Sequence, residues 1–215
     1  MIRPIGGEHG RFASMNERVH QLAVVGFYGA LTGIAVCWTW LRGARVEDLL
    51  APGTSSGWGI GDLLASGTSS GWGIEFALGM GVGLAVVVAG RLGHRLFAPI
   101  RRLSSEIREL LPRLKTWDVV LMAVTSGIGE ELLFRGAMQS AWGFWPTVIL
   151  FSVVHGFFIR RYWAWMAFAA VAGVLFGWMV LATGTLLAPI LAHATINGLN
   201  LAWLERTRPG TEHHG

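Results

Sequence analysis

The segment VVLMAVTSGIGEELLFRGAMQ (residues 119–139) has the length and apolar character of a membrane-spanning helix, yet it contains Glu130, Glu131 and Arg135. A run of about 20 apolar residues crosses a hydrocarbon core roughly 30 Å thick. Ionisable side chains near the centre of such a segment cost roughly 2.5–3.5 kcal/mol each, and they commonly mark functional sites. The segment therefore predicts a membrane protein with a polar site inside the bilayer.

The composition of the whole chain leads to the same class of protein. Of its 215 residues 53% are apolar and only 14% are charged, whereas soluble domains carry about 25% charged residues. Hydropathy predicts an all-α, polytopic membrane helix bundle with six spans. The first apolar run is too long for a signal peptide and no cleavage site follows it, so we expect it to be retained. The predicted spans are residues 21–41, 76–90 (or as far as 97), 119–139, 144–159, 163–183 and 186–204.

Positive charges predict the orientation of these spans. With six spans, fourteen of the 17 Lys and Arg residues fall on one side, Arg42 and Arg45 fall on the other, and Arg135 lies within the membrane. The positive-inside rule then places both termini in the cytoplasm. Because topology explains the net charge of +4, we expect no nucleic-acid partner. All but one of the basic residues are Arg, a composition that favours a prokaryotic plasma membrane as the location.

Three features outside the polar site carry weaker predictions. Residues 98–117 have apolar side chains at helical spacing between charges, which is typical of a helix lying in the membrane interface. The sequence DLLAPGTSSGWGI (48–60) recurs as DLLASGTSSGWGI (62–74), a local duplication of the kind tolerated in exposed loops. Close helix packing is predicted at three glycine pairs with four-residue spacing: Gly29/Gly33, Gly79/Gly83 and Gly173/Gly177.

Ionisable and amide side chains gather in the third, fourth and sixth predicted spans. At about 1.5 Å rise per residue, Glu130, His155 and His193 lie at nearly the same depth, so we expect one shared site. The residues assigned to it are Glu130, Glu131, Arg135, His155, His193 and Asn197.

Helical geometry gives the two glutamates different roles. Glu131 and Arg135 are four residues apart, so they can form an internal ion pair that orients the site and reduces the cost of burial. Glu130 points about 100° away from Glu131 on the helix and remains available for proton chemistry. His193 and Asn197 are also four residues apart, so we expect them to present donors to the same space.

These residue types fit a hydrolytic site. Glu130 with His155 could hold and deprotonate a water molecule, and His193 with Asn197 could donate hydrogen bonds to a developing oxyanion. The alternative is a Zn²⁺ ion bound by Glu130, His155 and His193, but there is no HExxH motif and no cysteine at metal spacing. We therefore favour a metal-free site. A proton or ion relay in a transporter is the competing function, although the chain shows no inverted repeat of the kind found in transporters.

The motifs EELLFR (130–135), FSVVH (151–155) and HATIN (193–197) resemble the EExxxR, FxxxH and HxxxN pattern of the CPBP family. This family comprises CAAX proteases and bacteriocin-processing (Abi) proteins, and the resemblance covers residues 117–204. It implies intramembrane proteolysis of a membrane-embedded or lipid-anchored protein or peptide, of CAAX, bacteriocin or C-terminal sorting-signal type. It also implies that the first glutamate and the FxxxH histidine activate water, while the later His and Asn form an oxyanion hole.

The resemblance further implies a division of the chain into three parts. Residues 1–116 would hold the N-terminal tail, two spans, the duplicated loop and the interfacial helix. Residues 117–204 would form a four-span catalytic core, and residues 205–215 a tail.

Overall fold

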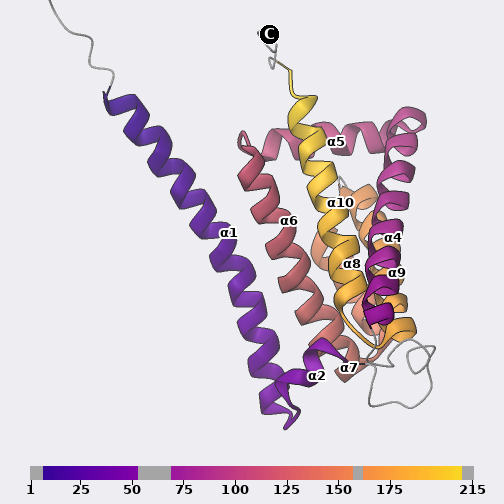
Figure 1. The fold of residues 1–215 in the computed structure, drawn as a ribbon. Helices are drawn as coiled ribbons and strands as arrows, with labels where there is room; N and C mark the ends of the chain where they lie inside the picture. Colours follow the sequence, from indigo (N-terminus) through magenta and orange to yellow (C-terminus); the bar gives the residue numbers. More distant parts are fainter. Residues whose placement is uncertain (1–6, 53–68, 157–161, 210–215) are drawn as a thin grey trace, which may run out of the picture.

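The computed structural model describes residues 7–52, 69–156 and 162–209, and within these ranges the regular structure is helical, with no strand. The long helices lie side by side, and the N-terminal half of α1 stands away from the others (Figure 1). The longer helices are α1 (Gly7–Leu41), α4 (Ser69–Leu96), α5 (Ala98–Leu110), α6 (Thr116–Glu131), α8 (Phe144–Gly156), α9 (Trp163–Thr183) and α10 (Leu187–Arg206). Two short helices, α2 (Val46–Leu50) and α7 (Gln139–Trp142), and a π-helix, η1 (Leu132–Met138), complete the described chain.

Three segments are long and apolar enough to cross a membrane: Arg18–Leu41 in α1, Trp72–Leu96 in α4, and α9. They indicate a multi-pass membrane protein, as the composition predicts. Helices α6 and α10 fall outside this set, and they carry four of the six predicted polar residues: Glu130, Glu131, His193 and Asn197. Helix α8 is apolar but spans only Phe144–Gly156, and the rest of the fourth predicted span, residues 157–159, lies outside the described residues.

The third predicted span is not a single regular helix. Helix α6 ends at Glu131, η1 continues to Met138, and α7 completes the run to Trp142. A π-helix bonds each N–H to the carbonyl five residues earlier, and such turns occur frequently at functional sites. The change of helix type falls inside the EELLFR motif, between Glu131 and Leu132.

Helix α4 begins earlier than the second predicted span, which was placed at residues 76–90. Helix α4 starts at Ser69, so Glu75 lies inside it and is buried, with the Thr185 hydroxyl donating a hydrogen bond to its carboxylate. A candidate membrane span thus contains a buried carboxylate in addition to those of the predicted site. Glu75 is accommodated because Thr185, in the turn between α9 and α10, lies next to it.

Glycines at two of the three predicted pairs lie at close helix contacts. A Cβ on Gly79 would lie 2.5 Å from the Ala188 carbonyl oxygen, and one on Gly83 would lie 2.9 Å from Thr195 Cβ, so α4 and α10 pack tightly. At Gly177 a Cβ would come within 2.8 Å of Gln139 and Phe144. Gly29 and Gly33 have open space around them, so that part of the prediction is wrong.

The amphipathic segment forms helix α5 as predicted, and it crosses the end of the bundle near the C-terminal end of α10 (Figure 1). Its apolar residues Ile100, Leu103 and Ile107 face a cavity inside the bundle. Most of the loop duplication, residues 53–68, lies outside the described residues.

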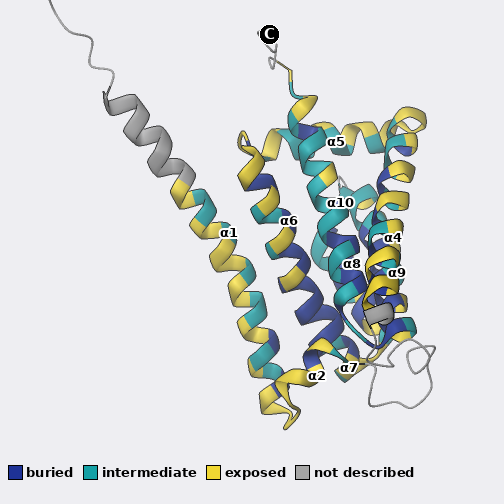
Figure 2. Ribbon diagram, in the orientation of Figure 1, coloured by how far each residue is buried: buried dark blue, intermediate teal, exposed yellow. Residues whose placement is uncertain are grey.

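Burial is concentrated where α6 and η1 meet α8, α9 and α10, whereas the described part of α1 is largely exposed (Figure 2). Two apolar clusters hold this region together. One includes Leu133, Phe134 and Phe151, and the other includes Phe176, Met179 and Ala192. The predicted polar residues of the EELLFR motif lie in this most buried part of the molecule.

Candidate active site

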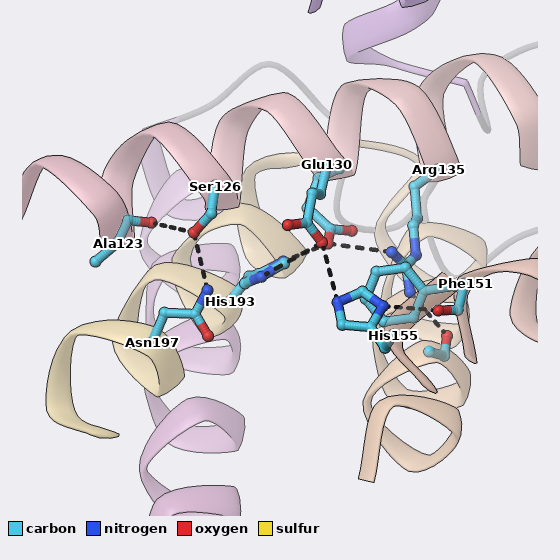
Figure 3. A network of polar contacts seen from close by, with 10 residues as sticks. Ala123, Ser126, Glu130, Arg135, Phe151, His155, His193 and Asn197 are labelled. Atoms are coloured by element: carbon cyan, nitrogen blue, oxygen red, sulfur yellow. Dashed lines mark hydrogen bonds and ion pairs between the residues drawn. The ribbon is translucent and has the colours of Figure 1, made fainter. Parts of the chain in front are cut away.

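Helices α6, α8 and α10, together with η1, bring five of the six predicted site residues into one cluster (Figure 3). Side chains from three separate predicted spans thus lie together in space. The five residues are Glu130, Glu131, Arg135, His155 and His193.

One side of the cluster is closed to solvent and holds an ion pair, although Glu131 Oε2 and Arg135 Nε are buried with no hydrogen-bond partner among the described residues. Glu131 is 0% exposed and Arg135 is 1% exposed. The Glu131 Oε1 atom lies 3.2 Å from Arg135 Nη1, as the four-residue spacing predicts, and accepts a 2.7 Å hydrogen bond from His193 Nδ1. A single carboxylate oxygen therefore ties the arginine of η1 to the histidine of α10.

Aromatic rings surround the Arg135 guanidinium. Its central carbon lies 4.1 Å from the centroid of the Phe151 ring, 5.3 Å from that of Phe176 and 5.9 Å from that of Phe134. A cation within about 6 Å of a ring centroid is attracted by the ring quadrupole. Nη2 also donates a 3.4 Å hydrogen bond to the Gly173 carbonyl. Phenylalanines in apolar spans are ordinary core residues in a sequence, so this environment carries no distinct sequence signal.

The other side of the cluster is built around Glu130. Its Oε2 atom lies 3.5 Å from His155 Nε2 and 4.0 Å from His193 Nε2. His155 Nδ1 lies 2.7 Å from the Phe151 carbonyl oxygen, and because a carbonyl only accepts, Nδ1 carries the hydrogen. The Nδ1 atoms of both histidines are thus occupied, and both Nε2 atoms face the same carboxylate oxygen.

This arrangement is suited to holding a mobile proton. A neutral histidine whose Nδ1 carries the hydrogen presents a lone pair at Nε2, and that lone pair faces the Glu130 carboxylate. Two acceptors are stable so close together only when a proton or a water molecule lies between them. A carboxylate and an imidazole in this relation can take a proton from water and return it.

Glu130 and His155 also line a cavity of about 550 Å³. Its other walls are mostly apolar and come from α1, η1, α8 and the start of α9, including Leu31, Phe134 and Trp165. The paired carboxylate Glu131 does not reach this cavity. The two glutamates thus lie in different environments, as their helical positions predict.

Asn197 lies apart from the cluster, one turn along α10 from His193 (Figure 3). Its Nδ2 atom donates a 2.8 Å hydrogen bond to Ser126 Oγ, which in turn donates to the Ala123 carbonyl at 3.3 Å. Asn197 and Ser126 line a second cavity, of about 300 Å³. The expectation that His193 and Asn197 face one space is therefore not met, because each side chain is held by a different residue of α6.

Ser126 is a site neighbour that the sequence interpretation missed. It lies one turn before Glu130 on α6 and is 1% exposed. Its position four residues before the glutamate, in an otherwise apolar segment, is the signal that could have indicated it.

The zinc alternative requires a group of side chains arranged around an ion. Among the residues that the structure describes, no group of three or more His, Cys, Asp or Glu side chains has an arrangement that could hold a metal ion. Glu130 and the two imidazoles instead face one another directly at 3.5 and 4.0 Å. We therefore derive no step through a metal.

Comparison with known proteins gives the site a family context. Residues 112–199 match the family described as type II CAAX prenyl endopeptidase Rce1-like. The uncharacterized protein YpbD of Bacillus subtilis (strain 168) is 29% identical over 83 residues, which are 38% of this chain and 42% of that protein. The chain thus spans less than half the length of this relative, and no solved structure matches it. Since the matched region contains all three motifs, residues 112–199 of this chain form a domain of the type II CAAX prenyl endopeptidase Rce1-like family.

Proposed function

We propose that this protein is an intramembrane endopeptidase in which Glu130 activates the attacking water. The observation that carries the proposal is the Glu130 carboxylate, faced by the Nε2 atoms of His155 and His193 at the wall of an apolar cavity. The family of residues 112–199 supports a protease.

The proposed reaction takes place on the open side of the cluster, where Glu130 and His155 line the apolar cavity. A water molecule at Glu130 loses a proton to the carboxylate while its oxygen attacks the carbonyl carbon of the scissile peptide bond. The tetrahedral intermediate collapses, the C–N bond breaks, and the proton on Glu130 passes to the leaving nitrogen. His155, whose Nδ1 is fixed on the Phe151 carbonyl, keeps Nε2 beside this exchange. General acid–base catalysis of this kind contributes about 10²- to 10⁴-fold in rate.

The remaining site residues are proposed to stabilise the charge of the oxyanion or to orient His193. His193 is assigned to the oxyanion as an imidazolium, which donates from Nε2 because Nδ1 already donates to Glu131. Asn197, one turn along α10, is assigned to the same oxyanion through the amide hydrogen that Ser126 does not use, which requires its side chain to turn toward the cluster when substrate binds. Glu131 and Arg135 position His193, because their shared contact fixes its Nδ1 atom. The proposed roles are thus divided between the open and closed sides of the cluster.

The proposed substrate is a membrane-embedded or lipid-anchored protein or peptide. The cavity beside Glu130 is walled mainly by apolar side chains, and burial of apolar surface favours lipid chains and membrane segments over polar peptides. Substrates of CAAX, bacteriocin and sorting-signal type all meet this description.

We further propose that residues 117–204 form the catalytic core of a six-span protein of the prokaryotic cell membrane, with both termini in the cytoplasm. In support, α6, η1 and α7 form a continuous helical run from residue 116 to 142, and α10 has 20 residues. At about 1.5 Å per residue, both are long enough to cross a hydrocarbon core roughly 30 Å thick. Their polar residues turn inward, which is the arrangement expected for ionisable groups in membranes.

The test is cleavage of membrane-anchored reporter peptides, lipidated and unlipidated, by purified protein in lipid nanodiscs, with products identified by mass spectrometry. We expect cleavage by the wild type and its loss in His155→Ala and His193→Ala. His20→Ala, which removes a histidine of α1 outside the cluster, is the matched control and should retain the wild-type rate. Proton or ion flux through the protein with no cleavage of any reporter would support the transporter function instead.

A second arm of the assay addresses the metal. After treatment with a strong chelator and verified removal of metal, we expect the rate of cleavage to be unchanged. Loss of cleavage that added Zn²⁺ restores would contradict the metal-free reaction.

A further inference from the structure

The cavity of about 300 Å³ that is lined by Ser126 and Asn197 also reaches a group of basic side chains. Its lining includes Arg91 and His94 of α4 and Trp203 of α10. Trp203 lies six residues after Asn197, which is about 9 Å along a helix with a rise of about 1.5 Å per residue. One cavity therefore joins the neighbourhood of the candidate active site to the end of the bundle that α5 crosses.

Two arginines from different helices lie over the Trp203 ring. The guanidinium carbon of Arg91 lies 4.2 Å from the ring centroid, and that of Arg108, on α5, lies 6.0 Å from it. The arginines donate hydrogen bonds to neutral oxygens. Arg91 donates to the Asn200 side chain at 2.9 Å, and Arg108 donates to the Leu204 carbonyl at 3.2 Å. The two positive charges are thus held on one side of the cavity wall by groups that do not neutralise them.

Two further basic side chains adjoin this ring. The His94 ring centroid lies 4.8 Å from that of Trp203, and Arg101 Nη1 donates a 3.5 Å hydrogen bond to the His94 carbonyl. Among the residues that the structure describes, no carboxylate forms an ion pair with Arg91, Arg101 or Arg108. Like charges at such separations repel one another. This basic cluster, Arg91, His94, Arg101 and Arg108, therefore favours the binding of an anion.

The position of the basic cluster indicates the kind of anion. Arg91 and His94 lie in the last turns of the candidate span Trp72–Leu96, so we expect them near the level of the lipid headgroups. Helix α5 crosses the bundle at the same end (Figure 1), and its apolar side chains line the cavity. Basic pockets between membrane helices on the cytoplasmic side, which this end is proposed to face, bind the headgroups of anionic lipids. Apolar walls such as Leu103 and Phe168 suit an acyl chain.

We propose that this cavity binds an anionic phospholipid, with the phosphate between Arg91 and Arg108 beside Trp203 and one acyl chain extending toward Asn197. Arginine suits this role because its planar N–H donors match two oxygens of a phosphate. The inference goes beyond the proposed function, since lipid binding here requires no peptide cleavage. Because the same cavity reaches Asn197, the bound lipid is a neighbour of the candidate active site.

The probe is dioleoyl-phosphatidylglycerol, added to the purified full chain in a nonionic detergent. Dioleoyl-phosphatidylcholine, which has the same acyl chains and no net charge, is the control lipid. Native mass spectrometry measures the bound lipid, and thermal unfolding measures its effect, because a ligand that binds only the folded state raises Tm. We expect phosphatidylglycerol to remain bound and to raise Tm, and phosphatidylcholine to do neither. Equal binding of the two lipids overturns the proposal.

Arginine variants locate the phosphate. Arg91→Gln and Arg108→Gln each remove one cation of the proposed site. Arg95→Gln and Arg102→Gln are matched controls, because they remove an exposed cation from the same two helices. Loss of a hydrogen bond to a charged group corresponds to about a tenfold or larger rise in Kd. We expect that rise for phosphatidylglycerol in the first two variants and a wild-type Kd in the controls. An unchanged Kd in the first two, or the same rise in all four, overturns the proposal.

Ile107→Trp tests the place of the acyl chain while keeping every arginine. Ile107 lines the cavity from α5, a helix in which no residue is buried, so the larger side chain occupies the cavity with little effect on folding. We expect weaker binding of phosphatidylglycerol, and unchanged binding contradicts the proposal. A short peptide with a free C-terminal carboxylate is the competing ligand. If this peptide raises Tm in the wild type but not in Arg91→Gln, and phosphatidylglycerol does not raise Tm, the cluster binds peptide and the lipid site is wrong.

Discussion

The closed and open sides of the buried cluster differ although they begin at adjacent residues. On the closed side, Glu131 is 0% exposed and shares one oxygen between Arg135 and His193. On the open side, the Glu130 side chain is 11% exposed, that of His155 is 21% exposed, and both border a cavity. A helix turn of about 100° per residue is enough to give neighbouring glutamates different partners.

The difference shows how charged side chains can be stabilised in the interior of a membrane protein. A buried ion stays favourable only when its partner and its hydrogen bonds are in place. The closed side meets this requirement through Glu131 Oε1, which contacts Arg135 and His193, whereas Glu131 Oε2 has no hydrogen-bond partner among the described residues. The open side is held less tightly, so its groups can exchange a proton with a water molecule. This difference is the basis for the proposed roles, in which Glu131 positions its neighbours and Glu130 takes part in the chemistry.

The largest expected effect comes from the open side. Glu130→Gln and His155→Ala should each lower kcat by about 10²- to 10⁴-fold, the range for general acid–base groups. The double variant should be scarcely slower than the slower single variant, because residues that act as a unit are not additive. Cleavage rates of the four purified proteins measure this, and additive losses would show that the two side chains work independently.

A stability effect is expected from the closed side. Arg135→Leu leaves the Glu131 carboxylate buried without its cation, which typically costs about 3–5 kcal/mol. Adding Glu131→Gln removes the stranded charge, so the double variant should recover part of that loss. Denaturant or thermal unfolding in detergent micelles measures both changes. A stable, well-folded but inactive Arg135→Leu protein would instead place Arg135 in the chemistry.

An intermediate effect is expected where the second cavity meets α10. Asn197→Ala should lower kcat by about 10²-fold, near the lower limit for loss of one oxyanion donor. Thr195→Val is the matched control, because Thr195 faces Met80 of α4 and its hydroxyl contacts the Met80 sulfur at 3.2 Å. A rise in KM with kcat unchanged would assign Asn197 to substrate binding.

The smallest effect is expected at the buried carboxylate of α4. Glu75→Gln keeps the shape of the side chain that accepts the Thr185 hydroxyl. A single hydrogen bond contributes about 0.5–1.5 kcal/mol, so unfolding should shift by about 1 kcal/mol or less and cleavage should be unaffected. A loss of cleavage would extend the functional site to the far end of α4.

Much of this arrangement is predictable from the sequence because it depends on spacing along single helices. Residues 163–183 were expected as a span and form α9, and the Glu131–Arg135 pair follows from a four-residue separation. The common depth of Glu130, His155 and His193 follows from helical rise alone. These predictions need no knowledge of which helices are neighbours.

The features that the sequence did not reveal depend on neighbours or on a departure from regular helix. Helix η1 has no composition of its own, since LLFRGAM is as apolar as the residues around it apart from Arg135. The rings around Arg135 come from η1, α8 and α9, and they resemble ordinary core phenylalanines. The Asn197–Ser126 bond was missed because i,i+4 spacing shows a shared face but not what that face meets.

The most direct test of the account is single-turnover cleavage of a membrane-anchored reporter by Glu130→Gln, measured beside Glu75→Gln. Both variants replace a buried carboxylate with an amide of the same size. We expect Glu75→Gln to cleave at the wild-type rate and Glu130→Gln, although folded with an unchanged Tm, to be slower by at least about a hundredfold. A folded Glu130→Gln protein that cleaves as fast as the wild type would contradict it.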